Sequence, residues 1–379
     1  MHLADITMFY AAEGGGVSTY LNAKSDWLRQ RGVTHTILSP NVDSGGHLVA
    51  LPSLPVPGLH GYKWPWTVSH CARILRELAP DLVEAGDAGP CAYAALRAAR
   101  ALGIPAVAFY HSDTPRLLLR RLGTVAEMGC ERYLATLYRR FDLVLAPSRL
   151  MVQRLAAMGV EGALHQTLGI DSRTFSPQRR DPGLRTELGL PADARLLVYA
   201  GRFTPEKRLD VLAGALARLG EPYYLLLIGD GPSPPEPGER IVQRDFLRDR
   251  GELARMLASC DVLVHAGDSE TFGLIALEAM SCGLPVVCTG GGIAELVTPG
   301  TGVHAEPDNV EAFAAAVESV YRMDRMALAA NARRKAVEQH DWDVVLPQVM
   351  ARYERLLAPK RGRTPDIAGA RADSLFWRK

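Results

Sequence analysis

The segment of residues 261–298 constrains the fold more than any other part of the chain. It begins with an apolar, β-branched run of strand length at residues 261–265. Apolar residues at helical spacing follow over residues 274–280, and a glycine and a proline then end that helix. A second strand is predicted at residues 284–289, before three glycines where the backbone can approach a ligand closely and a new helix from Ile293. This β-α-β-α pattern predicts a parallel sheet, whose ligands bind at the carboxyl ends of its strands.

Two carboxylates and a set of backbone amides lie within this unit. Glu270 follows the first strand and Glu278 lies in the next helix, so both can face one crevice. Sugar hydroxyls are suitable donors to such carboxylates. The free N–H groups around Thr271, Phe272 and Gly273, at the helix start, favour a phosphate. The pattern predicts a site for a hydroxylated and phosphorylated molecule. The alternative is a turn glutamate and a solvated helix glutamate, and for Glu278 alone we favour that alternative.

Two further strand ends carry candidate site residues. The strand at residues 4–10 leads through a glycine run containing Gly15 and Gly16 into a helix, an arrangement that lets backbone amides approach a phosphate. A plain tight turn is the alternative there. His111 follows the strand at residues 106–110, a preferred position for chemistry in a parallel sheet. Two acids are weaker candidates for the same edge: Asp87 and Asp113.

Length and composition restrict the class of protein. The 379 residues suit two domains, each large enough for its own core. The formal charge of +1 argues against a nucleic-acid-binding protein. Neither an apolar run of membrane-spanning length nor a signal-type amino terminus is found, so we expect a soluble cytoplasmic protein. The six cysteines lack metal-ligand spacing and are expected to be reduced and buried.

Glu270 and Glu278 form an E-x7-E pattern inside ETFGLIALEAMSCGLPVV, and this segment resembles the signature of retaining GT-B glycosyltransferases of family 4. That group includes bacterial mannosyl-, glucosyl- and other hexosyltransferases. The resemblance implies an α/β fold of two Rossmann-like parallel-sheet domains that face a deep interdomain cleft. The implied parts are an acceptor-side domain at 1–175, a linker at 176–192, a donor-binding domain at 193–344, a helix crossing back at 345–358 and a disordered tail at 359–379.

The resemblance also implies roles for individual residues. Arg202 and Lys207 take the positions of a clamp on the leaving diphosphate, for which solvated surface cations are the alternative. Glu270 would hold the sugar, Glu278 the ribose hydroxyls, and His111 would lie near the reacting sugar. The remaining donor contacts implied are Gly15, Gly16, Phe246, Thr271, Phe272, Gly273 and Leu274. Arg244 and Asp245 before Phe246 depart from the usual base-reading pattern, which leaves the base open.

The predicted function is a retaining, metal-independent transfer of a hexosyl unit from UDP-hexose or GDP-mannose to an acceptor hydroxyl. No cofactor and no metal are expected, because protein cations meet the leaving diphosphate. The acceptor is a lipid, a glycan or a small molecule. The alternatives are a nucleotide-sugar epimerase on the same scaffold and an inactive membrane-attached scaffold.

Two segments bear on membrane contact. Residues 116–140 form a locally basic, amphipathic helix with six arginines, either for an anionic membrane surface or as an ordinary solvated helix face. Aromatic residues gather at 60–66, as an acceptor or membrane surface or as a packed loop. A peripheral position on the inner face of the cytoplasmic membrane is therefore one expectation.

Overall fold

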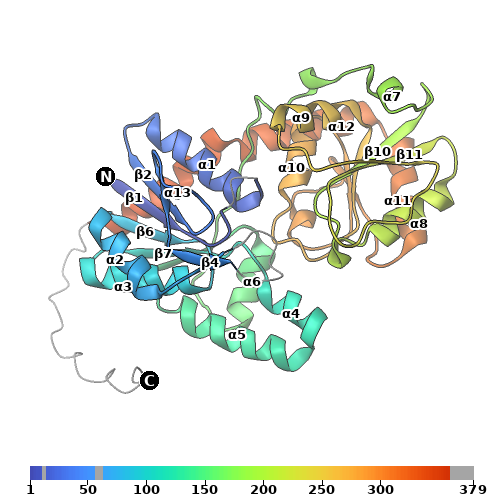
Figure 1. The fold of residues 1–379 in the computed structure, drawn as a ribbon. Coiled ribbons are helices and arrows are strands. Elements are labelled where there is room, and N and C mark those ends of the chain that lie inside the picture. The colour runs from blue at the N-terminus through green and yellow to red at the C-terminus, as the bar shows by residue number, and fades with distance from the viewer. Residues whose placement is uncertain (11–13, 56–62, 359–379) are drawn as a thin grey trace.

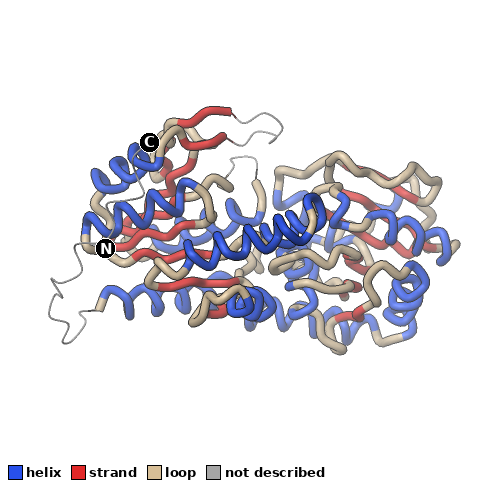
Figure 2. The backbone as a smooth tube through the Cα atoms, turned by 90° about the horizontal axis from the view of Figure 1, so that it is seen from below, coloured by secondary structure: helices blue, strands red, loops and turns tan. Residues whose placement is uncertain are grey.

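Two parallel β-sheets, each covered by helices, form two lobes that lie side by side in the computed structural model (Figures 1 and 2). The structure describes residues 1–10, 14–55 and 63–358. The predictions for residues 60–62 of the aromatic segment and for the tail at 359–379 lie outside the described residues. The predicted fold class of two Rossmann-like parallel sheets is confirmed.

The first sheet has the strand order β3-β2-β1-β6-β7-β8-β9, with all neighbours parallel. Its strands are β1 His2–Ile6, β2 Thr34–Ser39, β3 Leu48–Ala50, β6 Leu82–Ala85, β7 Ala106–Phe109, β8 Leu143–Ala146 and β9 Leu164–His165. An antiparallel pair is formed by β4 Ser53–Pro55 and β5 Lys63–Pro65. The chain order reverses between β1 and β6, so the loops after these strands flank the position where parallel sheets bind ligands.

Helices connect these strands and cover both faces of the first sheet. They are α1 Gly16–Arg29, α2 Val68–Leu78, α3 Pro90–Leu102, α4 Thr114–Leu122, α5 Thr124–Tyr138 and α6 Arg149–Ala157. The basic segment, interpreted from the sequence as one helix, is two helices, α4 and α5. The interruption is Gly123, whose φ of 81° lies in the left-handed region that side chains other than glycine disfavour.

The second sheet has the order β12-β11-β10-β13-β14-β15, again entirely parallel. Its strands are β10 Arg195–Ala200, β11 Tyr223–Ile228, β12 Ile241–Arg244, β13 Val262–His265, β14 Val286–Cys288 and β15 Gly302–His304. Here the order reverses between β10 and β13. The loops that follow these two strands therefore converge at the candidate ligand-binding edge.

Most of the helical elements of the second half cover this sheet. The elements of that half are η1 Pro177–Arg179, α7 Leu184–Glu187, η2 Pro205–Lys207, α8 Leu209–Leu219, α9 Arg250–Ser259, α10 Leu274–Ser281, η3 Gly292–Glu295, α11 Val310–Arg322, α12 Arg325–His340 and α13 Trp342–Leu357. The new helix predicted from Ile293 is wrong: only the 3-10 turn η3 forms. Pro299 disfavours helical backbone at the residue before it, which leaves no room for a longer helix.

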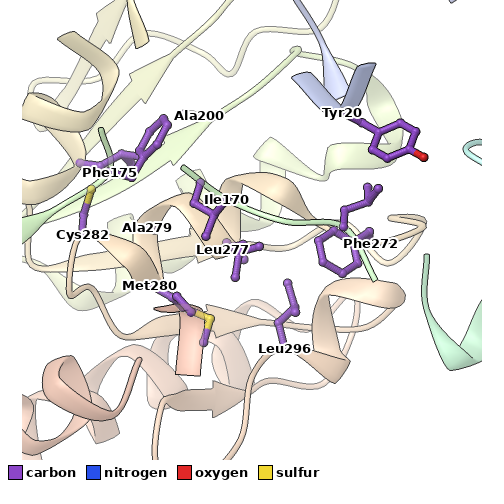
Figure 3. Packing of buried hydrophobic residues seen from close by; sticks show 14 of the residues in the cluster. Tyr20, Ile170, Phe175, Ala200, Phe272, Leu277, Ala279, Met280, Cys282 and Leu296 are labelled. Carbon is purple, nitrogen blue, oxygen red and sulfur yellow. The ribbon is translucent and has the colours of Figure 1, made fainter. Parts of the chain in front are cut away.

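A continuous hydrophobic core joins the two lobes. It includes Tyr20 of α1 together with Phe272 and Leu277 of the second half, all of them buried (Figure 3). Helix α13 lies against α1 of the first lobe, as Figure 1 shows. Its Tyr353 is fully buried, and Lys24 of α1 donates a hydrogen bond of 2.9 Å to the Tyr353 hydroxyl. The carboxyl-terminal helix therefore fastens the second half of the chain to the first sheet.

Candidate active site

Lys207 and Glu270 meet where the loops after β10 and β13 converge. The Lys207 ammonium donates a hydrogen bond to Glu270 Oε1, and His265 Nε2 lies 3.1 Å from the same oxygen. Burial alone would raise the pKa of Glu270, but the nearby Lys207 charge and the His265 hydrogen bond outweigh it and hold that pKa well below its usual range. Glu270 is therefore an ionised carboxylate at neutral pH and cannot donate a proton.

Close backbone packing fixes the loop that carries Glu270. Gly291 has a φ of 78°, and a Cβ there would lie 2.8 Å from Asp268 O. A Cβ on Gly292 would lie 2.1 Å from Thr271 O, and the Gly292 N–H donates to Glu270 O at 2.6 Å. The glycine run was interpreted as a place where a ligand approaches the backbone. In the structure the neighbouring loop of the same chain packs against Gly291 and Gly292, and the approach of a ligand to this run stays a prediction.

The start of α10 presents unpartnered backbone amides. Gly273 caps the helix with a φ of 99°, and a Cβ there would lie 2.8 Å from the Ile293 side chain. Among the described residues, the N–H groups of Phe272, Gly273 and Leu274 have no hydrogen-bond acceptor. The Phe272 ring itself is buried in the shared core. Free amides at a helix start are suited to an anionic or oxygen-rich ligand.

Thr271 connects this loop to the other lobe. Its hydroxyl donates to His111 O at 3.0 Å, and its carbonyl accepts a 2.7 Å hydrogen bond from the Ser148 hydroxyl. Ser148 is also the amino-terminal cap of α6, and its side chain accepts a hydrogen bond from the Met151 N–H. The side chain of Thr271 thus holds the two lobes together, which places His111 beside the loop of Glu270.

His111 has the features of a ligand-facing imidazole. Its ring stacks on Phe109 with a centroid distance of 4.3 Å, and Tyr20 lies at 5.6 Å. Burial lowers the pKa of His111 to about 3, so the ring is neutral at physiological pH. Its Nε2 is buried and lacks a hydrogen-bond partner among the described residues. A buried nitrogen without a partner is uncommon unless a ligand or water supplies one.

The first glycine loop lies opposite the start of α10. A Cβ on Gly16 would lie 3.3 Å from the Leu274 side chain, and a Cβ on Gly14 would lie 3.6 Å from the Phe246 ring. Gly15, with a φ of 120°, caps α1 and has no neighbour within 4 Å of such a Cβ. The structure therefore brings this loop together with Phe246 and the start of α10. The glycines at 14 and 16 also allow the two lobes to approach each other.

Glu278 is not solvated, so the alternative we favoured for it alone is wrong. It is 6% exposed, and Arg250 Nη2 donates to its Oε1 at 2.9 Å. The other arginine nitrogen, Nη1, donates to Thr19 Oγ1 of the first lobe at 3.1 Å. Burial raises the pKa of Glu278 and Arg250 opposes that rise. Sequence reasoning did not identify Arg250, because nothing near position 250 relates it to Glu278.

Sequence reasoning also did not identify His265, although a signal was present. This histidine is the last residue of β13, at the edge where parallel strands bind ligands. It is 1% exposed, and its Nδ1 has no partner among the described residues.

Three other candidates, all of them described residues, have no hydrogen bond to the group of Lys207, His265 and Glu270. Arg202 follows β10 as predicted, but its side chain is exposed and forms no ion pair within the described part of the chain. Asp87 is buried and accepts 2.7 Å hydrogen bonds from the backbone of Met8 and Gly89. The Asp113 carboxylate is paired with Arg154. The carboxylates of both aspartates are therefore engaged by groups of the first lobe. Their contact with a ligand stays a prediction.

Two facing Rossmann-like lobes with an ionised carboxylate, a lysine and free helix amides between them define a GT-B type of enzyme. Comparison with known proteins agrees. The family model described as Glycosyltransferase Family 4 matches residues 14–165, and that described as Glycosyl transferases group 1 matches residues 194–323. The chain therefore belongs to the glycosyltransferases of family 4. It is a hexosyltransferase that uses a nucleotide-sugar donor.

Individual relatives align along nearly the whole chain. A GDP-mannose-dependent alpha-mannosyltransferase of Mycobacterium tuberculosis is 29% identical, over 96% of this chain and 98% of the relative. A GDP-mannose-dependent alpha-(1-6)-phosphatidylinositol dimannoside mannosyltransferase of the same species is 28% identical, over 97% of this chain and 100% of the relative. The structure of sucrose-phosphate synthase from Thermosynechococcus elongatus superposes with a TM-score of 0.76 at 20% identity, over 94% and 99% of the two chains.

Proposed function

We propose that this chain is a retaining, metal-independent mannosyltransferase that takes mannose from GDP-mannose. The donor follows from the two mycobacterial relatives, which are named for GDP-mannose and align along almost their full length. The observation that carries the proposal is the group of Lys207, His265 and ionised Glu270 beside the unpartnered Nε2 of His111. Such a group can bind sugar hydroxyls and a diphosphate at one place.

The charges suit the reaction. As the bond between the anomeric carbon and the phosphate oxygen breaks, negative charge grows on the diphosphate and positive charge on the sugar. The Lys207 ammonium has three N–H donors, so it can keep its hydrogen bond to Glu270 and still donate one to a phosphate oxygen. Arg202 and the free amides of α10 supply further donors. A neutral His111 adds no positive charge beside the anomeric carbon. The acceptor oxygen bonds to that carbon and its proton passes to the departing phosphate, so the protein cations leave no step that requires a metal.

We further propose an acceptor carried by a lipid. The turn between α4 and α5 exposes three large apolar side chains: Leu122 is 70% exposed, Val125 86% and Met128 63%. We call these three residues the apolar tip. Two of the six arginines that suggested an anionic surface, Arg116 and Arg120, are paired with Asp268. The apolar tip is therefore the feature that supports membrane contact at this position.

No helix in the described ranges is both long and apolar enough to cross a membrane. The contact that we propose is peripheral, on the inner face of the cytoplasmic membrane.

Thermal unfolding with nucleotides tests the donor. The purified protein is heated with GDP, UDP, ADP and their sugar conjugates, with and without EDTA. Ligand at 100 times its dissociation constant should add about 2.7 kcal/mol to the free energy of unfolding. We expect GDP and GDP-mannose to raise the unfolding midpoint, each by the same amount with EDTA as without it. A midpoint shift with UDP compounds alone would contradict the assignment of GDP-mannose as the donor. Loss of the shift in EDTA would contradict metal independence. The anomeric configuration of the product, read by NMR, tests retention.

A further inference from the structure

Two arginines of the first lobe share one carboxylate of the second. Arg116 Nη2 donates to Asp268 Oδ2 at 2.6 Å, and Arg120 Nη2 donates to Asp268 Oδ1. Both arginines lie on α4, four residues apart and therefore on one face of the helix. One carboxylate cannot neutralise two guanidinium groups, so this cluster carries a net positive charge. The Arg116 Nε is buried and has no hydrogen-bond partner among the described residues.

The surrounding charges leave this excess in place. Arg154 and Arg208 also act electrostatically on Asp268, but each has other acidic partners. Those partners are Asp113 for Arg154, and Asp210 and Asp308 for Arg208. The side chains of Arg116, Arg120 and Asp268 are 31%, 35% and 21% exposed, so a solute can reach them.

The cluster lies beside the proposed reaction centre. Asp268 is two residues before Glu270, and Arg116 is five residues after His111. The hydrogen bond between Thr271 and His111 holds these two loops together. The same helix that carries the arginines ends at the apolar tip. A molecule bound at the arginines could therefore place a hydroxyl near the donor and an apolar tail at the tip.

We propose that Arg116 and Arg120 bind an oxyanion of the acceptor, a phosphate or a carboxylate, and that Asp268 is the internal counter-ion that it displaces. This proposal rests on the proposed transferase function. Guanidinium groups bind such oxyanions through paired hydrogen bonds. A phosphate monoester carries up to two negative charges and can satisfy both arginines and the free Nε, whereas Asp268 carries one. The acceptor is accordingly an acid.

Calorimetric titration of anions tests the proposal. The probes are inositol 1-phosphate and uncharged inositol, titrated with saturating GDP so that the diphosphate position is filled. We expect the native protein to bind inositol 1-phosphate and not uncharged inositol. Asp268→Asn should bind it at least tenfold tighter, and the double variant Arg116→Gln/Arg120→Gln at least tenfold more weakly. Arg132→Gln, which removes an exposed arginine of α5, is the matched control and should bind like the native protein.

Equal affinity for inositol 1-phosphate in all four proteins would overturn the proposal, and the arginines would then only tie the lobes together. The double variant Arg116→Lys/Arg120→Lys keeps the charge and should restore part of the binding, which separates lost binding from misfolding. A parallel series in the Lys207→Ala background removes the competing diphosphate site, so the result does not depend on GDP being the donor. Failure of GDP to bind would thus refute the donor and not this site.

Vesicles distinguish the two sources of the oxyanion. Vesicles of phosphatidylcholine with and without phosphatidylinositol are sedimented with the same proteins. Binding that phosphatidylinositol strengthens, and that is no longer strengthened when both arginines are replaced, would assign a lipid head group. Binding of free inositol 1-phosphate without such a difference between vesicles would assign a small phosphorylated acceptor.

Discussion

At the scale of single residues, the surroundings of each ionisable group in the candidate site set its protonation state. Glu270 stays ionised because Lys207 and His265 stabilise its negative charge. His111 stays neutral because burial disfavours its charged form. A negative carboxylate, a positive lysine and a neutral imidazole thus occupy neighbouring positions. This arrangement can hold a nucleotide sugar and stabilise the charges that develop as its glycosidic phosphate bond breaks.

Replacing Lys207 tests the charge that meets the leaving diphosphate. We expect Lys207→Ala to lower the turnover number by roughly two to three orders of magnitude, the usual effect of removing one preorganised stabilising group. The measurement is steady-state transfer from the donor that the thermal assay identifies. Lys63→Ala, at an exposed position of β5, is the control. Turnover near the native value would remove Lys207 from the mechanism.

The protonation of His111 can be followed directly. A lowered pKa of about 3 means that this ring gains its proton only as the pH falls through that value, well below the ordinary 6.5. NMR of the imidazole should therefore show no titration of His111 between pH 5 and 8. His111→Phe keeps the stacking on Phe109 but removes Nε2, and it should lower transfer by about 10-fold, the effect of losing one hydrogen bond to the sugar. A titration midpoint near 6.5 would contradict the buried, neutral ring.

At the scale of elements, the connections between helices and strands determine which residues meet. Gly123 divides the basic segment into two helices, so the apolar tip combines the end of α4 with the first turns of α5 and does not follow one continuous helix. Helix α4 lies on the side of the first lobe nearer the second lobe, as Figure 1 shows. Its Arg116 and Arg120 pair with Asp268 of that second lobe. The segment of residues 116–140 therefore presents arginines to the second lobe and apolar side chains to the surface.

The apolar tip should govern binding to neutral lipid. We expect the triple variant Leu122→Ser/Val125→Ser/Met128→Ser to bind phosphatidylcholine vesicles about 10 to 100-fold more weakly, because each buried methylene contributes about 0.8 kcal/mol. Sedimentation with vesicles measures this. Met326→Ser is the control, since Met326 is 85% exposed on α12 of the other lobe. If both variants bind equally, the tip does not contact lipid.

At the scale of the whole molecule, buried polar groups hold the carboxyl-terminal helix on the first sheet. Lys24 Nζ lies 2.9 Å from Asp5 Oδ1 and 3.3 Å from Glu84 Oε1, and all three side chains are at most 3% exposed. Tyr353 of α13 donates a hydrogen bond to Glu84. Burial raises the pKa of Glu84 to about 7. The Lys24 charge opposes this rise and the Asp5 charge adds to it, because one lysine is shared between two carboxylates.

This raised pKa makes stability depend on pH. Between the ordinary value of 4.5 and about 7 the folded protein holds a proton on Glu84 that the unfolded chain has lost, so the free energy of unfolding falls as pH rises. We expect a loss of about 3 kcal/mol across this window relative to Glu84→Gln, which cannot titrate. Urea unfolding at pH 5 and pH 7.5 measures it. Glu338→Gln, at an exposed position of α12, is the control and should lose as much unfolding free energy between these two pH values as the native protein. If the pKa of Glu84 were ordinary, Glu84→Gln would also lose as much as the native protein.

Much of the fold follows from local sequence. The alternation of strand and helix, and with it the two parallel sheets, depends on hydrophobic periodicity and on turn residues, which act over a few neighbouring positions. The same patterns placed Glu270, His111 and Lys207 after strands, where parallel sheets bind ligands. The family resemblance rests on residues 261–298, which the chain presents in one continuous stretch.

Side-chain pairing across the lobes was decided by the tertiary structure alone. Arg116 and Arg120 reach Asp268 only because the shared core docks the two lobes in one arrangement. Arg250 reaches Glu278 because α9 packs on α10 within the second lobe. Residues separated by 28 to 152 positions carry no local signal of such contacts. The sequence by itself therefore determined most of the elements and the reaction class. Which charges are paired and which remain available to a substrate depended on how those elements pack.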